Sequence, residues 1–124
     1  TALGIAGKAV RIFRECFASK PEDLWAAIGP AIGPCCYEVD DKVWLEFNDH
    51  PGIEKPLKPA TKEGHWMLDL SLANQLQLEA AGVPTGQIGV AGICTSCHRD
   101  AFFSHRGEGE TTGRQLNFIM IRDN

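Results

Sequence analysis

Apolar residues near the start of the chain recur at alternating spacings of three and four, which is the period of an α-helix with one apolar face. The pattern predicts a helix over residues 2–19, which Pro21 ends because proline interrupts the helical hydrogen bonds. The core-facing stripe of this helix would consist of Leu3, Ala6, Val10, Phe13 and Phe17. The apolar run at residues 24–28 then predicts a short buried strand.

The middle of the chain predicts two further helices. Asp40 has the position of an N-cap for a helix that runs to about residue 49. Prolines make residues 51–63 an irregular surface loop, and apolar alternation after the loop predicts an extended segment. Ser71 would cap the next helix and Gly82 would follow its C-terminus. The inner face of that helix would consist of Leu72, Ala73, Leu76 and Ala80.

The last third of the chain predicts two strands around a long loop. Residues 87–93 form the second buried strand, and residues 116–122 form a closing strand. The loop between them, residues 94–113, contains one aromatic turn at Phe102 and Phe103.

A stiff loop over residues 28–39 carries two adjacent thiols. Its two Gly-Pro pairs restrict the backbone, so that Cys35 and Cys36 are delivered to one place. One interpretation is that both cysteines are small buried hydrophobic residues. The other is that one of them, with a slight preference for Cys35, is a nucleophile or metal ligand, because a helix N-terminus just after the loop would favour its thiolate.

Two histidines offer themselves as partners for these thiols. His50 lies at the end of the second predicted helix, where a charged surface residue would also suit the helix dipole. His65 lies in the extended segment. Either one with Cys35 would form a pair able to bind zinc or to act as nucleophile and base, and the spacing does not choose between them.

A second group of cysteines follows the second predicted strand. The run from Cys94 to His98 matches the pattern of c-type haem attachment, but nothing in the sequence indicates export, so we reject that function. A zinc site formed by Cys94, Cys97, His98 and His105 would lack the usual paired spacing. We therefore prefer a loop with partly buried thiols.

Two arginines, Arg106 and Arg114, flank a glycine-containing loop. Solvated loop charges are the simplest interpretation. The planar guanidinium also suits phosphate or a flat heterocycle, so that binding of an anionic substrate is the second interpretation. The chain contains neither a Walker motif nor a dinucleotide fingerprint.

Composition narrows the class of protein. With 124 residues, 44% hydrophobic residues and a net charge of −4, the chain is one domain or part of one, and nucleic-acid binding is not indicated. No apolar run approaches the roughly 20 residues of a membrane span. The five cysteines are an odd number and two are adjacent, which favours a reducing cytoplasm over a disulfide framework.

Several of these segments, taken in order along nearly the whole chain, resemble the laccase-domain family, also described as multicopper polyphenol oxidase and as purine nucleoside phosphorylase. The resemblance implies an α/β fold with layered mixed β-sheets flanked by helices, similar to the cytotoxic necrotizing factor fold. The matching segments are residues 28–39, Leu68-Asp69-Leu70, Ala73-Asn74, Gln77-Leu78, Ala81-Gly82-Val83, Cys94-Thr95, residues 102–106 and Thr112-Gly113-Arg114-Gln115.

The resemblance also implies a pocket in which one cysteine and two histidines surround zinc or copper. The family's three ligand motifs, Val-His-Gly, Ala-Asp-Cys and His-Ala-Gly-Trp-Arg-Gly, are absent from this sequence. We therefore expect residues 1–124 to be the C-terminal part of a single laccase-like domain whose N-terminal part is missing. The metal ligands are expected upstream, and we assign no metal ligand within this chain.

The function implied by the resemblance is that of a metal-dependent purine nucleoside phosphorylase, with adenosine deamination as a further activity. Its substrates would be a purine nucleoside and phosphate. Arg106 matches the arginine of the family's Phe-Phe-Ser-Tyr-Arg segment, and Arg114 matches that of its Thr-Gly-Arg segment. Both are predicted to bind substrate, although His105 replaces the tyrosine and Gly107 replaces a frequent second arginine. The catalytic residues are not assigned.

Three alternatives stay open. Copper-dependent oxidation of polyphenols is the older family description, but the sequence lacks the histidine clusters that a multi-copper centre needs. A metal-free Cys-His amidase using Cys35 or Cys36 is suggested by analogy with the distant fold relatives. The third alternative is a non-catalytic fragment that acts as a structural half-domain or binding surface.

Overall fold

The computed structural model describes residues 1–48 and 56–120. It contains four helices and five strands in the described ranges, together with three short 3-10 helices, Pro21–Asp23, Thr85–Gln87 and Gly109–Thr111. In chain order the helices and strands are α1 (Ile5–Phe17), β1 (Ala26–Ile28), β2 (Glu38–Asp40), α2 (Asp41–Asn48), β3 (Leu57–Pro59), β4 (His65–Leu68), α3 (Leu70–Ala80), β5 (Ile88–Val90) and α4 (His105–Glu108).

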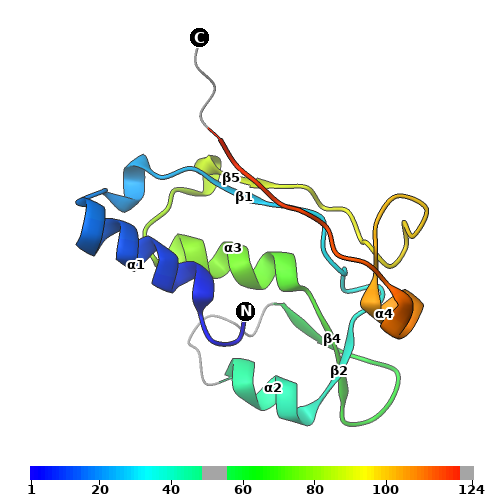
Figure 1. The fold of residues 1–124 in the computed structure, drawn as a ribbon. Coiled ribbons are helices and arrows are strands. Elements are labelled where there is room, and N and C mark those ends of the chain that lie inside the picture. The colour runs from blue at the N-terminus through cyan, green and yellow to red at the C-terminus, as the bar shows by residue number, and fades with distance from the viewer. Residues whose placement is uncertain (49–55, 121–124) are drawn as a thin grey trace.

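The strands form one parallel pair and one antiparallel sheet. β1 pairs with β5 in parallel, and β4 lies between β2 and β3 in a three-stranded antiparallel sheet. Helices α1 and α3 lie side by side next to the parallel pair, while α2 lies beside the antiparallel sheet (Figure 1). The predicted mixed α/β fold is therefore confirmed.

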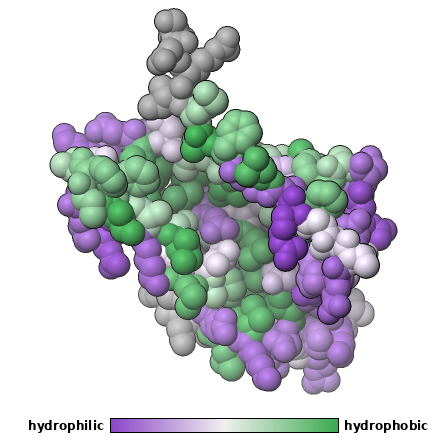
Figure 2. All heavy atoms as spheres, viewed as in Figure 1, coloured by the Kyte–Doolittle hydropathy of each residue, from purple (hydrophilic) through white to green (hydrophobic). Residues whose placement is uncertain are grey.

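Helix α1 forms where the sequence predicts it, but its apolar stripe is mostly exposed. Of the five predicted core positions only Val10 is buried, and Phe17 is 68% exposed. The helix approaches α3 closely at Gly7, where a Cβ atom would lie 3.7 Å from the Gln77 carbonyl oxygen. Because this contact covers a narrow face, the rest of the stripe stays on the surface. Figure 2 shows hydrophobic side chains over α1 and along the C-terminal segment.

The parallel strands are shorter and more exposed than predicted. Ile28 is half-buried and Val90 is 42% exposed, although both strands were expected to be buried. The reason is that, among the described residues, this sheet contains two strands, so that few neighbours cover them. Residues 116–120 form no strand, and 121–122 lie outside the described residues. The end of the described chain runs alongside β1 without a ladder of hydrogen bonds (Figure 1).

The hydrophobic core lies between the antiparallel sheet and helices α2 and α3. Its fully buried members are Val39, Phe47, Leu68 and Ala73. β3 lies within the predicted irregular loop, of which residues 51–55 are outside the described residues. The proline at the end of β3 is tolerated because β3 is an edge strand.

Side chains cap the second and third helices. Asp40 accepts a hydrogen bond from the Val43 N–H at 3.2 Å, as the sequence predicts. The third helix begins earlier than predicted, because Asp69 rather than Ser71 accepts the bond from the Leu72 N–H at 2.9 Å. Gly82 adopts a φ of +100° directly after the helix, which confirms its position at the helix end.

The inner face of α3 differs from the predicted one in two positions. Ala73 is buried as expected, whereas Ala80 is exposed and Gln77 is buried in its place. The buried amide of Gln77 donates a 2.7 Å hydrogen bond to the Thr1 carbonyl oxygen. None of the helices in the two described ranges is both long and apolar enough to cross a membrane.

Candidate functional site

The parallel strand pair brings two cysteine segments together. Beyond the strands, Ala31 and Cys94 form a parallel bridge. The Ala31 N–H donates to the Ile93 carbonyl oxygen at 3.2 Å, and the Thr95 N–H donates to the Ala31 carbonyl oxygen at 3.0 Å. Because the carboxyl ends of the two strands lie next to each other, the loops that leave them also meet. This is the edge of a parallel sheet where binding sites commonly lie.

Four thiols gather at this edge and are called the thiol cluster below. Their Sγ atoms all lie within 4.8 Å of one another, and the residues are Cys35, Cys36, Cys94 and Cys97. The Sγ atom of Cys97 is 3.5 Å from that of Cys35 and 3.5 Å from that of Cys36. All five cysteines are free thiols, and the fifth, Cys16, is exposed on α1.

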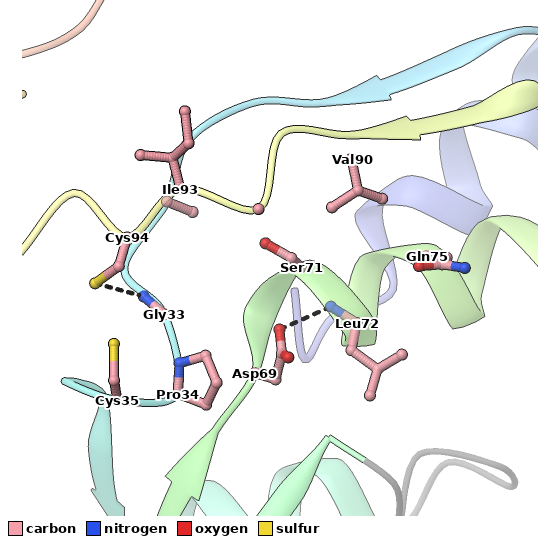
Figure 3. Close-up of a pocket in the computed structure, with 12 residues that line it drawn as sticks. Gly33, Pro34, Cys35, Asp69, Ser71, Leu72, Gln75, Val90, Ile93 and Cys94 are labelled. Atoms are coloured by element: carbon pink, nitrogen blue, oxygen red, sulfur yellow. Dashed lines mark hydrogen bonds between the residues drawn. The ribbon is translucent and has the colours of Figure 1, made fainter. Parts of the chain in front are cut away.

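Gly33 allows the two loops to approach so closely. Its N–H donates to the Cys94 Sγ atom at 3.2 Å. A Cβ atom at this position would lie 3.2 Å from the Cys94 Cβ atom and 3.4 Å from the Cys35 Sγ atom. Figure 3 shows this hydrogen bond, with the sulfur atoms of Cys35 and Cys94 turned toward one another. Any larger residue would press on both thiols.

Hydrogen bonds shift the pKa values of Cys94 and Cys97 in opposite directions. Burial raises the pKa of Cys94, but the N–H groups of Gly33 and Cys97 outweigh it and lower the pKa to about 6. Hydrogen bonds from Cys97 to the thiols of Cys36, Cys35 and Cys94 raise the pKa of Cys97 to about 12. The hydrogen bond with Cys97 lowers the pKa of Cys35, yet the bonds with Cys94 and Cys36 and its burial raise it overall. These hydrogen bonds therefore favour the thiolate form at Cys94 and disfavour it at Cys97.

A pocket of about 320 Å³ adjoins the thiol cluster. It reaches from Cys35 and Cys94 to the N-terminal half of α3, where the N-cap Asp69 and the helical residues Ser71 and Gln75 line it (Figure 3). The Asp69 carboxylate is already engaged by the Leu72 N–H. The Gln75 amide is engaged as well, because its Nε2 atom donates to the Glu79 carboxylate at 2.9 Å.

A second pocket, of about 290 Å³, surrounds Arg106 and is called the arginine pocket below. The Arg106 Nη1 atom donates to the Glu38 carbonyl oxygen at 2.9 Å, and the guanidinium carbon lies 5.0 Å from the centre of the Tyr37 ring. Within the described residues the guanidinium group therefore has a cation–π contact and one hydrogen bond, which uses one of its five N–H donors. The pocket is lined by Ile32, Tyr37, Leu70, Thr95, Phe103, Ser104, His105 and Arg106.

The short helix α4, which the sequence analysis assigned to a loop, carries Arg106. Ser104 caps it and accepts a bond from the Gly107 N–H at 3.3 Å. In return the Ser104 N–H donates to the Glu108 carboxylate at 2.8 Å, and the Thr112 hydroxyl donates to the same oxygen at 2.8 Å. This reciprocal bonding resembles a capping box, and Ser104 itself is buried.

Glu108 gives the arginine pocket a pH-dependent support. The hydrogen bond from the Ser104 N–H, followed by that from Thr112, lowers the pKa of Glu108 below its usual value of 4.5. A lowered pKa in the folded state stabilises the protein above the unfolded pKa and ceases to do so as the pH falls through the folded one. We therefore expect Glu108→Gln to be less stable than wild type at neutral pH and equally stable in acid.

Urea unfolding across a pH series, followed by circular dichroism, measures this difference. Glu110→Gln is the matched control, because Glu110 is exposed two residues further on in the 3-10 helix Gly109–Thr111. A stability difference between Glu108→Gln and wild type that persists unchanged in acid would show that the carboxylate charge is not responsible.

The remaining predicted residues lie apart from these two sites. Arg114 is exposed and does not line the arginine pocket, and its one hydrogen bond to a described residue is to the neighbouring Gly113 carbonyl oxygen at 3.3 Å. His50 lies outside the described residues. His65 contacts the Glu38 carboxylate at 2.8 Å rather than a thiol. The helix predicted after the cysteine loop begins at Asp41, but the strand β2 lies between its N-terminus and Cys35.

The zinc site considered from the sequence is corrected in half of its members. Cys94 and Cys97 do come together, but the Nδ1 atom of His98 lies 3.0 Å from the Cys94 carbonyl oxygen. The Nδ1 atom of His105 lies 3.1 Å from the Gly109 carbonyl oxygen. Within the described residues neither histidine belongs to the donor group, and the loop of Cys35 and Cys36 supplies the other two thiols.

A mixed α/β chain with a thiol cluster and an arginine pocket beside its parallel strands is thus the class of protein that the structure defines. The family model described as "Multi-copper polyphenol oxidoreductase laccase" matches residues 1–122, so the chain belongs to this family. The arginine pocket and the thiol cluster both lie within the matched range.

Named relatives and solved structures agree with this family. The chain is 49% identical over 124 residues to "Purine nucleoside phosphorylase YlmD" of Geobacillus stearothermophilus, covering 99% of this chain and 45% of the relative. It is 30% identical over 128 residues to "Purine nucleoside phosphorylase LACC1" of Homo sapiens, covering 99% of this chain and 29% of that protein. The crystal structure of YlmD from Geobacillus stearothermophilus matches with a TM-score of 0.85 and 47% identity, covering 90% of this chain and 42% of that one. The chain therefore spans less than half the length of these relatives.

The family description raises the question of copper. A multi-copper centre is built from clustered histidines. Among the described residues the histidines do not cluster: His65 faces a carboxylate, while His98 and His105 face backbone carbonyl oxygens. The described donors do not fit a multi-copper centre, and we derive no reaction step through one. What the chain does offer a metal is a set of four thiols.

Proposed function

We propose that this chain is the C-terminal part of a purine nucleoside phosphorylase, which cleaves a nucleoside with phosphate to give the free base and a pentose 1-phosphate. The observation that carries the proposal is the guanidinium of Arg106, held over Tyr37 at the wall of the arginine pocket. Relatives that bear this enzyme name support it.

The arginine pocket has the chemistry that such a substrate needs. Arg106 spends one N–H group on the Glu38 carbonyl oxygen and retains donors for a phosphate or a purine ring nitrogen. Phe103 and Tyr37 line the same pocket and offer aromatic surface to a flat base. Arg114, outside this pocket, would bind substrate only from its rim, and we retain it as the weaker part of the proposal.

The proposal includes a larger domain. Large hydrophobic residues in α1 and just before it are exposed, among them Phe17 at 68% and Leu3 at 73%, and Leu116 is 87% exposed. Exposed apolar surface of this extent is typical of a face that another part of a protein covers. We propose that the remaining part of the domain, of the kind that the relatives carry, covers this face and holds the family's metal ligands. The free thiols support a cytoplasmic location.

The test is phosphate-dependent breakdown of inosine and adenosine, followed by chromatography. It compares this chain with a form extended upstream of Thr1 by the protein's own sequence or by the N-terminal part of the Geobacillus stearothermophilus relative. We expect the extended form to release hypoxanthine and adenine only when phosphate is present. Conversion of adenosine to inosine in the same chromatograms tests the further activity of adenosine deamination.

Two results would decide against this function. If neither form releases a base at high enzyme concentration, phosphorolysis is wrong and polyphenol oxidation becomes the next assay. If the base is released equally well without phosphate, the enzyme is a hydrolase rather than a phosphorylase.

A further inference from the structure

We propose that Cys35, Cys36, Cys94 and Cys97 bind one zinc ion, which clamps the loops at the carboxyl ends of β1 and β5. In the described part of the chain these four residues are the group whose donor atoms lie close enough to share a metal ion. The inference does not depend on the phosphorylase activity, because it rests on the thiol cluster and its surroundings and not on the arginine pocket.

The distances between the sulfur atoms fit a tetrahedral site. A zinc ion with four Zn–S bonds of about 2.3 Å places its sulfur atoms about 3.8 Å apart. Two sulfur pairs of the thiol cluster are 3.5 Å apart, and every pair lies within 4.8 Å. Shifts of a few tenths of an ångström up to about one ångström therefore convert the cluster into zinc geometry.

A disulfide explains the same sulfur atoms less well. It joins two sulfur atoms at about 2.05 Å and leaves the others without a partner. Here the Sγ atom of Cys97 is equally distant from those of Cys35 and Cys36, and Cys94 also lies within reach. One central ion satisfies all four thiols at once, whereas no single disulfide does.

The surrounding backbone supports ligands rather than isolated thiols. The spacing of Cys94 and Cys97 is the usual one for a pair of zinc ligands. The Gly33 N–H already donates to the Cys94 sulfur. Hydrogen-bond donors around a metal site commonly orient a ligand in this way. Bonds from the N–H groups of Cys36 and Tyr37 to the Gly33 carbonyl oxygen, both 3.0 Å, close the turn that holds the adjacent pair.

The donor type selects the ion. An all-thiolate tetrahedral set favours zinc and iron-sulfur chemistry over magnesium or calcium, which prefer oxygen ligands. A site closed by four protein ligands is typical of structural zinc. The zinc ion would fix the position of one wall of the arginine pocket, because Ile32 and Thr95, which line that pocket, lie within the two clamped loops.

The experiment measures metal content and thiol reactivity of the chain purified under reducing conditions. We expect one zinc ion per chain by elemental analysis, and one thiol, that of Cys16, reacting rapidly with Ellman's reagent in the native protein. A strong chelator should raise the rapidly reacting thiols from one to five, because all cysteines are then free. Substitution of cobalt for zinc should give the absorption bands of a tetrahedral thiolate site.

Variants locate the site. Cys97→Ser and Cys35→Ser should each lower the zinc content at least tenfold, whereas Cys16→Ser, on α1, should retain one zinc ion and serves as the matched control. The wild-type measurement stands even if a variant fails to fold. Metal-free wild type with five rapidly reacting thiols overturns the proposal, as does a cluster disulfide in protein handled with reductant. Stoichiometric copper or iron in place of zinc overturns the assignment to zinc.

Discussion

Replacing Arg106 with alanine in the extended, active form is expected to lower kcat/KM for inosine phosphorolysis by about 100-fold to 1,000-fold, the loss typical of removing one preorganised donor to developing charge. The guanidinium is exposed, so its removal leaves no cavity in the core. Its position is held by the contact with the Tyr37 ring and by the hydrogen bond to the Glu38 carbonyl oxygen before any substrate arrives. Because the guanidinium group is preorganised in this way, its hydrogen bond to the charge that develops on the substrate should be strong in the transition state.

Three comparison variants sharpen this prediction. Arg106→Lys keeps the charge but loses the planar fork and should recover only a small part of the activity. Arg114→Ala should cause a smaller loss, because that side chain lies outside the arginine pocket. Arg11→Ala is the matched control: Arg11 is exposed on α1 and contacts only Glu15, at 3.9 Å, among the described salt bridges.

The outcomes separate the role of Arg106 from the proposed function itself. Unchanged activity of Arg106→Ala beside an active wild type would remove the arginine from substrate binding and leave phosphorolysis in place. An inactive wild type in the extended form would instead refute the phosphorolysis proposal. A loss of activity with unchanged urea unfolding distinguishes binding from damage to the fold.

Local signals in the sequence predicted the parts of the fold that depend on local chemistry. Asp40 caps α2 and Gly82 follows α3, because each needs only a hydrogen bond or a positive φ within one turn. The cap of α3 was misplaced by two residues since Asp69 and Ser71 are both acceptable N-caps by type. The choice between them depends on the course of β4, which local sequence does not encode.

Burial was harder to predict because it depends on neighbours. The apolar stripe of α1 has helical periodicity, yet Phe13 and Phe17 are exposed since the described elements do not cover them. The strand Ile88–Val90 shows the same limit, because its pattern resembles a buried strand although it has one paired neighbour. Periodicity therefore identified the elements and their types better than their surroundings.

The thiol cluster could be predicted only with knowledge of the strand topology. Each half was visible as a motif, but the two halves are 61 or 62 residues apart in the sequence. What joins them is the parallel pairing of β1 with β5 and the bridge from Ala31 to Cys94. The available signal was that both cysteine pairs lie in loops that leave predicted strands, since neighbouring parallel strands end at the same edge of a sheet.

The largest expected effect on stability comes from the core beside α2. Phe47 is 2% exposed and packs with Val39 and Leu68 in the core of the antiparallel sheet. Phe47→Ala removes this contact and leaves a cavity, so that the free energy of unfolding should fall by about 3–5 kcal/mol. Urea unfolding followed by circular dichroism measures the change.

Leu45 provides the matched control on the same helix. It is 58% exposed, so Leu45→Ala should change the free energy of unfolding by less than about 0.5 kcal/mol. Both substitutions introduce alanine into α2, and helix propensity therefore contributes little to their difference. If both variants lost the same stability, α2 would not present Phe47 to the sheet. A large loss in Phe47→Ala alone would support the packing of Phe47 in the core between α2 and β4. β4 is the central strand of the antiparallel sheet, between β2 and β3, and α3 follows it in the sequence.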